Sequence, residues 1–163
     1  MRFLPIFKFD KKTDISQWSI IDDVVMGGKS SGEFCLNEKG NGVFQGRVSL
    51  ENNGGFSSLR YRFSALNSTA YSKIIITIKG DGKSYKLRFK TKQSDSHSYI
   101  THFNTSKNWE TLAFSMAEME PIFRGRKLDL PNYKDTTIEE IAFIIGNKEE
   151  EHFKLEIDEI LLE

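Results

Sequence analysis

The sequence has little cysteine and no long hydrophobic run. Its one cysteine, Cys35, excludes a disulfide within the chain, and a lone thiol is typical of a reducing compartment. The N-terminal apolar run is too short for a secretory signal peptide, and it lacks a small-residue cleavage site. No apolar stretch approaches the roughly 20 residues that cross a bilayer, so we expect no integral membrane segment. Together these absences predict a cytoplasmic protein.

An excess of charge of either sign is also absent. Lysine plus arginine and aspartate plus glutamate number 23 each, so the formal net charge is zero. A neutral chain has no general attraction for nucleic acid, and we expect no nucleic-acid partner. The three histidines do not cluster and no cysteine lies near them, so we assign no metal ligand and no cofactor.

The 163 residues show no composition shift, repeat or low-complexity segment, which indicates one domain over residues 1–163. The hydrophobic pattern has a period of two, which is typical of half-buried strands. Apolar residues alternate with basic ones over 59–63 and 85–90, and with other residues over 74–78. The sequence therefore predicts an all-β fold, an antiparallel β-sandwich or jelly roll.

Four local patterns add detail to this prediction. The turn Gly80-Asp81-Gly82 between two alternating runs predicts a β-hairpin. Residues 141–145 are apolar without alternation, which favours a central strand covered on both faces. The alternation changes parity near Asp158-Glu159, which predicts a β-bulge. Thr136 with Glu139 resembles a capping box and predicts a short helical turn.

The first of three polar segments is "DDVVMGGKSSGEF", residues 22–34, whose Gly28-Lys29-Ser30 resembles the end of a phosphate-binding loop. That motif needs a glycine four residues earlier, where this chain has Asp23. A carboxylate there repels phosphate, so we reject a nucleotide site. Asp22 and Asp23 are then either paired carboxylates for acid–base chemistry or calcium binding, or residues that cap a turn, and we favour the structural role.

The second segment, "SLENNGGFSSLRYRF", places many hydrogen-bonding groups around the turn at 52–55. Glu51, Asn52, Asn53 and Arg60 are candidates for binding a polar ligand. The asparagines and glycines also suit a tight turn, because they tolerate positive φ. Ligand binding and turn formation both remain open for this segment.

The third segment, "EPIFRGRKL", predicts an exposed basic loop carrying Arg124 and Arg126. We favour ion pairs of these arginines with the carboxylates of the other two segments, since arginine binds carboxylates in a bidentate manner. Trp18 and Trp109 are expected to be core residues. We expect the three segments to meet in space and to supply the candidate ligand-binding residues Asp22, Asp23, Glu51, Asn52, Asn53, Arg60, Arg124 and Arg126.

These segments, in this order, resemble the complex I intermediate-associated protein 30 family. The resemblance rests on Trp18, Trp109 and the quoted stretches "DDVVMGGKSSGEF", "FQGRVSLENNGGFSSLR", "KGDGKSYKL", "PIFRGR" and "FKLEIDEILL". It implies a galactose-binding-like β-sandwich. It also implies kinship with assembly factors for respiratory complex I, which is the role of the mitochondrial members.

Three functional hypotheses follow. The leading one is a non-enzymatic, chaperone-like binding module, resembling a complex I assembly factor, with a protein partner such as respiratory complex subunits. The alternative is a module that binds a carbohydrate or another small polar ligand through the same loops. The third is an enzyme with Asp22 or Glu51 as general base, which would need a raised carboxylate pKa in a cleft.

Overall fold

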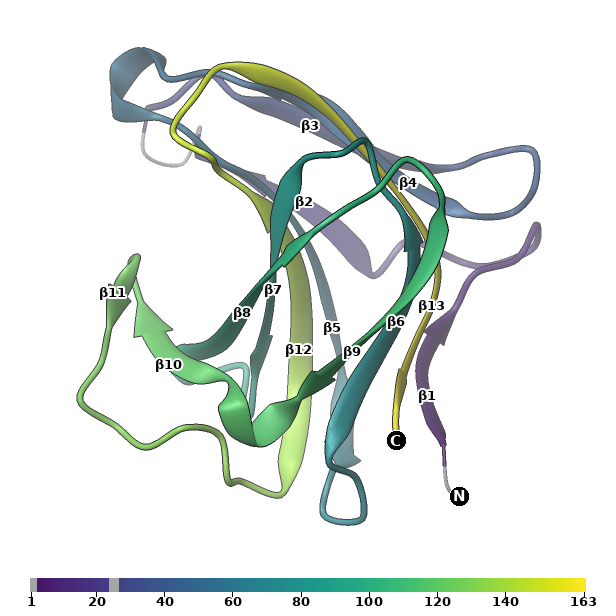
Figure 1. Cartoon of the computed structure of the whole chain (residues 1–163), viewed down its shortest axis with the longest axis vertical. Coiled ribbons are helices and arrows are strands. Elements are labelled where there is room, and N and C mark those ends of the chain that lie inside the picture. Colours follow the sequence, from purple (N-terminus) through teal and green to yellow (C-terminus); the bar gives the residue numbers. More distant parts are fainter. Residues whose placement is uncertain (1–2, 24–26) are drawn as a thin grey trace.

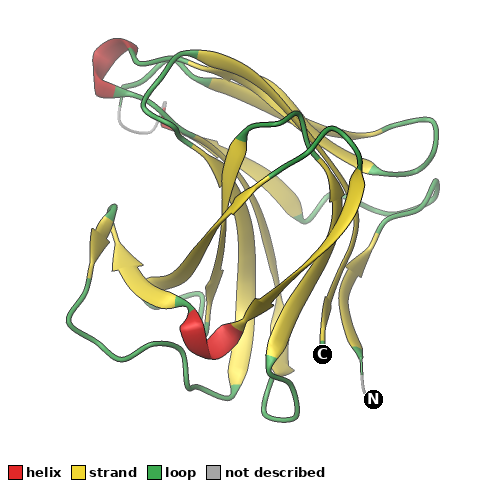
Figure 2. Cartoon of the chain, viewed as in Figure 1, coloured by secondary structure: helices red, strands yellow, loops and turns green. Residues whose placement is uncertain are grey.

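The computed structural model describes residues 3–23 and 27–163, apart from the side chain of Asn53, and shows two antiparallel sheets packed face to face (Figure 1). Strands account for most of this ribbon, and short 3₁₀ turns lie at Glu51–Asn53 and Met116–Glu118 (Figure 2). The strands are β1 (Leu4–Lys8), β2 (Trp18–Asp22), β3 (Ser31–Leu36), β4 (Gly42–Val48), β5 (Ser57–Asn67), β6 (Lys73–Lys79), β7 (Ser84–Lys90), β8 (Ser98–Asn104), β9 (Trp109–Ser115), β10 (Glu120–Phe123), β11 (Arg126–Lys127), β12 (Thr137–Ile145) and β13 (Glu151–Leu162).

We name the two sheets after a long interior strand of each. The β13 sheet has the order β3-β4-β13-β6-β9, and β1 also pairs with β13. The β12 sheet has the order β11-β10-β8-β7-β12-β5-β2. Because Leu4 pairs with Leu162, the two ends of the chain lie side by side (Figure 1). The predicted all-β, antiparallel sandwich of jelly-roll type is confirmed.

The core lies between the sheets, where each alternating strand directs its apolar residues inward. Ile76 of β6 and Leu87 of β7 are fully buried, as their alternation predicts. Trp18 is a core residue, as expected, and its indole stacks on the Tyr61 ring at 4.7 Å between centroids. Trp109 is 41% exposed on the edge strand β9, so the expectation that it lies in the core is wrong.

The turn at 80–82 joins the two sheets rather than the two strands of a hairpin. β6 pairs with β13 and β9, whereas β7 pairs with β12 and β8, so the predicted hairpin is wrong. Alternation shows which face of a strand is buried, but it does not show which strand lies beside it. Asp81 fixes the link by accepting hydrogen bonds from the Tyr85 hydroxyl (3.1 Å) and the Lys154 amide (2.8 Å).

Two local predictions are confirmed and one is wrong. β12 lies between β7 and β5, with Ile141, Ala142 and Phe143 fully buried. The pairing of β13 with β6 shifts between Ile157 and Glu159, which is the predicted bulge. Residues 137–145 form β12, so the capping-box pattern at Thr136 does not start a helix. In the ranges that the structure describes, no helix is long and apolar enough to cross a membrane.

Candidate functional site

Asp23 joins the first two polar segments from a buried position at the end of β2. Its Oδ1 accepts a hydrogen bond from the Ser30 amide at 2.9 Å. Its Oδ2 accepts from the Ser30 hydroxyl at 2.5 Å, the Gly55 amide at 2.7 Å and the Phe56 amide at 3.3 Å. The carboxylate therefore ties the loop after β2 to the loop before β5.

Glycines of both segments make room for this carboxylate. A Cβ atom on Gly28 or on Gly54 would overlap the side chain of Asp23. Gly28, which gave the first segment its resemblance to a phosphate loop, thus allows close packing around a buried aspartate, as does Gly54 of the second segment. Asp22 has a similar structural contact, because its side chain accepts hydrogen bonds from the Gly32 amide (2.9 Å) and the Ser57 hydroxyl.

The arginines of the third segment do not pair with these carboxylates. Among the described residues, no ion pair joins Arg124 or Arg126 to Asp22, Asp23 or Glu51, so the expected pairing is wrong. Both aspartates already accept hydrogen bonds from backbone amides and serine hydroxyls, so their negative charges are stabilised without a neighbouring arginine. Glu51 instead lies 3.8 Å from the Lys29 ammonium, with both side chains 62% exposed.

The remaining loop candidates lie at the surface. Asn52 is exposed and has a left-handed backbone (φ 56°), as turn formation requires. Asn53 lies outside the described side chains. Arg124 and Arg126 are exposed on the hairpin β10–β11, where Arg124 (φ 50°) and Gly125 (φ 77°) form the left-handed tip. A role in ligand binding remains a prediction for these residues.

Hydrogen bonds control the ionisation of Asp23. Burial raises the pKa of its carboxyl, but hydrogen bonds from Ser30, Gly55 and Phe56 outweigh burial and hold that pKa below its ordinary value of 3.8. The folded chain therefore binds this proton less readily than the unfolded chain. The stabilisation is complete above the unfolded pKa and is lost as the pH falls through the lower folded pKa.

We therefore expect acid to reduce the stability difference between the wild-type chain and Asp23→Asn. The difference should be constant above about pH 5 and should shrink below about pH 4. Urea unfolding at a series of pH values measures it, and Asp10 and Asp14, whose pKa values are also lowered, cancel because both chains contain them. A difference independent of pH would show that the ionised carboxylate is not the stabilising form.

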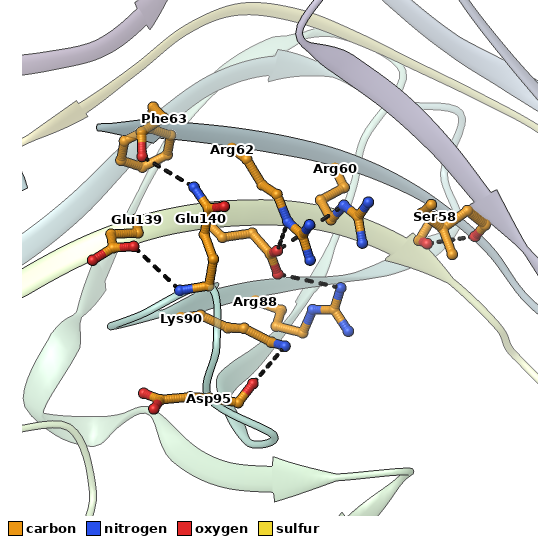
Figure 3. A network of polar contacts seen from close by, with 11 residues as sticks. Ser58, Arg60, Arg62, Phe63, Arg88, Lys90, Asp95, Glu139 and Glu140 are labelled. Carbon is orange, nitrogen blue, oxygen red and sulfur yellow. Dashed lines mark hydrogen bonds and ion pairs between the residues drawn. The ribbon is translucent and has the colours of Figure 1, made fainter. Parts of the chain in front are cut away.

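The exposed face of the β12 sheet carries a second buried carboxylate, Glu140, which is 1% exposed (Figure 3). The Arg62 guanidinium donates from Nε to Oε1 of Glu140 at 2.7 Å. Arg60 and Arg88 approach the same carboxylate at 4.0 and 3.8 Å. These arginines come from β5 and β7, on either side of β12, so the cluster spans three strands.

An apolar cavity of about 730 Å³ adjoins this cluster. Arg88 borders both the cluster and the cavity, and Arg124 lies at the cavity's rim on the hairpin β10–β11. Its apolar lining comes from Phe56, Ile100, Ile122, Phe123 and Ile144. The cluster and the cavity thus form one continuous surface, which we call the β12 face.

The three polar segments contribute to the β12 face in different ways. The second segment supplies Phe56 to the cavity, and the third supplies residues 122–125. The first segment lies behind them, where Asp23 holds the Phe56 amide. The predicted meeting of the segments therefore occurs, but the aspartates position the wall of the cavity and do not line it.

The sequence interpretation missed Glu140, Arg62 and Arg88 as site residues. For the two arginines the sequence did contain a signal. Basic residues alternate with apolar ones along 60–62 and 86–90, which places the basic side chains on one face of each strand. That signal could not show that β5 and β7 flank β12 and surround its glutamate. In the ranges 3–23 and 27–163, no group of three or more His, Cys, Asp or Glu side chains is placed to hold a metal ion.

Several solved structures similar to this chain are carbohydrate-binding modules. A family 11 module from Clostridium thermocellum, solved with a β-1,3-1,4-mixed-linked tetrasaccharide, has a TM-score of 0.71 and 15% identity, covering 98% of this chain and 94% of the module. A family 29 module has a TM-score of 0.57 and 10% identity, covering 99% and 87%. At these identities the similarity shows a shared fold.

The sequence comparisons point to an assembly-related family. The mitochondrial complex I intermediate-associated protein 30 of Drosophila melanogaster is 22% identical over 146 residues, covering 76% of this chain. The chain spans about half the length of that relative, 49%. The model of the family Complex I intermediate-associated protein 30 (CIA30) matches residues 7–157, nearly the whole sequence. The chain therefore belongs to the complex I intermediate-associated protein 30 family.

Proposed function

We propose that this chain is a non-enzymatic binding module that holds a protein partner on the β12 face during assembly of a multisubunit complex. The observation that carries the proposal is the apolar cavity of about 730 Å³ beside the arginine cluster. Apolar surface rimmed by charged groups is typical of a protein-interaction site. Family membership supports a role related to complex I assembly, with respiratory complex subunits as partners.

The non-enzymatic part of the proposal draws support from the surroundings of Asp22 and Glu51, the two carboxylates considered as general bases. The Asp22 side chain already accepts hydrogen bonds from the Gly32 amide and the Ser57 hydroxyl. The Glu51 side chain is 62% exposed and lies 3.8 Å from the Lys29 ammonium. These surroundings suit a structural residue and a surface residue rather than a base in a cleft.

Carbohydrate binding is the second candidate function. The fold similarity to a module solved with a tetrasaccharide favours it, and the cavity contains two phenyl rings, those of Phe56 and Phe123. The indoles, which offer larger platforms for a sugar ring, lie elsewhere. Trp18 is in the core and Trp109 is on β9 of the other sheet.

A single pair of variants tests the proposed function. Ile144 lines the cavity, while Ile75 is a half-buried isoleucine in β6 of the other sheet, so Ile144→Lys and Ile75→Lys make the same change on opposite sheets. We expect affinity capture from the source organism to recover subunits of a membrane complex with the wild-type chain and with Ile75→Lys. Ile144→Lys should lose them.

Two results would contradict the proposed function, one from a sugar titration and one from the capture experiment. Calorimetric titration of the wild-type chain with the mixed-linked tetrasaccharide runs beside the capture experiment. Binding of the sugar, lost in Ile144→Lys, with no captured subunit would replace the proposed function by carbohydrate binding. Capture that survives Ile144→Lys would place the partner away from the β12 face.

A further inference from the structure

The register of β12 places Ala142 between two arginines. Ala142 pairs with Arg60 on β5 and with Arg88 on β7. Neighbouring strands lie about 4.8 Å apart, so the two arginine backbones are about 10 Å from each other. The residue between them contributes only a methyl group, so this row of the sheet has two cations and no counter-charge of its own.

The next row along the strands contains the carboxylate that the cluster shares. Glu140 pairs with Arg62 on one side and Lys90 on the other, and its short contact, at 2.7 Å, goes to Arg62. Arg60 and Arg88 reach it only at 4.0 and 3.8 Å. The cluster therefore has a net positive charge, which is concentrated on the row that contains Ala142.

Two hydrogen-bond donors in the row that contains Ala142 lack an acceptor. The Nε atoms of Arg60 and Arg88 are both buried without a hydrogen-bond partner in the described part of the chain. Burial also lowers the pKa of both guanidinium groups. Buried donors without partners are costly. The side chains of both arginines are still 25% exposed, so an anion from outside can approach the two guanidinium groups and add the charged hydrogen bonds that they lack.

We propose that an acidic segment of the partner protein places a carboxylate between Arg60 and Arg88 and the apolar side chain next to it in the adjoining cavity. Ile100 pairs with Arg88 across β7 and β8 and lines the cavity, so the two subsites are neighbours. This inference rests on the proposed function and specifies the chemistry of the partner. An Asp or Glu beside a large apolar residue is the recognition element.

A peptide fits this surface better than other anions do. A phosphate would use the arginines but not the apolar cavity. A neutral sugar would leave the two cations without a counter-charge. A peptide offers a carboxylate and an apolar group on adjacent residues, at the spacing that joined subsites require.

The experiment selects peptides from a random twelve-residue display library on the wild-type chain and measures their binding by fluorescence anisotropy. We expect the selected peptides to be enriched in Asp or Glu next to a large apolar residue. Arg88→Gln and Arg60→Gln should each weaken binding about tenfold or more, as expected for loss of a charged hydrogen-bonding partner. Added salt should also weaken binding.

Arg47→Gln is the matched control, since Arg47 is an exposed arginine of β4 on the other sheet and the charge change is identical. It should leave binding unchanged. Thermal unfolding of each variant shows whether the β12 sheet is intact, and two separate arginine variants guard against one that does not fold.

The outcomes separate this inference from the proposed function. Neutral or basic peptides that bind, lose affinity in Ile144→Lys and keep it in Arg88→Gln would overturn the inference and leave the proposed function standing. Two sugars serve as further probes: the mixed-linked tetrasaccharide, which is neutral, and polygalacturonate, an acidic polysaccharide. If no peptide is selected and either sugar binds, both the inference and the proposed function fail. Peptides that bind equally well to Arg88→Gln, Arg60→Gln and Ile144→Lys would also overturn both.

Discussion

Asp23→Ala is expected to lower the free energy of unfolding by about 4 kcal/mol, because charged hydrogen bonds are lost and buried donors are left without an acceptor. The amides of Ser30, Gly55 and Phe56 and the Ser30 hydroxyl all donate to this one carboxylate. The loss should be smaller than the sum of separate hydrogen bonds, since the loops can relax together.

Urea unfolding at neutral pH measures this loss. Asp129→Ala is the control, because Asp129 is exposed in a loop and its replacement should change stability by about 0.5 kcal/mol or less. An Asp23→Ala chain that unfolds with the same free energy as the control would contradict the structural role of the first segment. The aspartate would then have to be reconsidered as a ligand-binding residue.

Glu140→Ala is expected to cost about 3 kcal/mol, because removal of one partner of a buried ion pair leaves the other charges uncompensated. Glu140 is 1% exposed and has guanidinium groups on both sides (Figure 3). The arginines themselves are 25–41% exposed, so they can regain water, which keeps the loss at the lower end for a buried pair.

A double-mutant cycle with Arg62→Ala separates the ion pair from the loss of packing. We expect a clear coupling between Glu140 and Arg62, and almost none between Glu140 and the distant Arg47. Glu118→Ala, which removes an exposed glutamate, should be close to neutral. Equal losses for Glu140 and Glu118 would show that the arginine cluster does not depend on the buried carboxylate.

Much of the fold could be predicted from the pattern of apolar residues alone. The buried faces of β5, β6 and β7, the interior position of β12 and the bulge in β13 all follow from which residues are apolar. The rejection of a phosphate loop also came from one residue, Asp23. The structure adds the reason for Gly28 and Gly54, which pack against that carboxylate.

Strand neighbours were beyond the reach of these patterns. The turn at 80–82 has the composition of a hairpin but crosses between the sheets, where Asp81 is held by a residue far along the chain, Lys154. The Thr136–Glu139 pattern favoured a helix, but pairing on both sides draws the segment into a strand. Local preference is overridden when a segment occupies the centre of a sheet.

For the candidate site too, the sequence pointed to single residues but not to the strands that lie beside them. Arg60 was named from its segment, yet the other residues of its cluster come from β12 and β7, about 80 and 30 residues away in the sequence, as the register of the sheet requires. The loop residues drew attention because they are polar and clustered. The residues that surround the cavity are mostly apolar and lie on separate strands, so no short motif marks them.

The loops of the first two polar segments position the wall of the cavity, and in the proposed function the β12 face itself binds the partner. Amide chemical shifts of the ¹⁵N-labelled chain, titrated with a selected acidic peptide, test it most directly. We predict the largest shift changes at Arg60, Arg88, Ala142 and Ile144. Changes concentrated at Lys29, Glu51 and Asn52, with the β12 face unaffected, would contradict the claim and return the site to the loops.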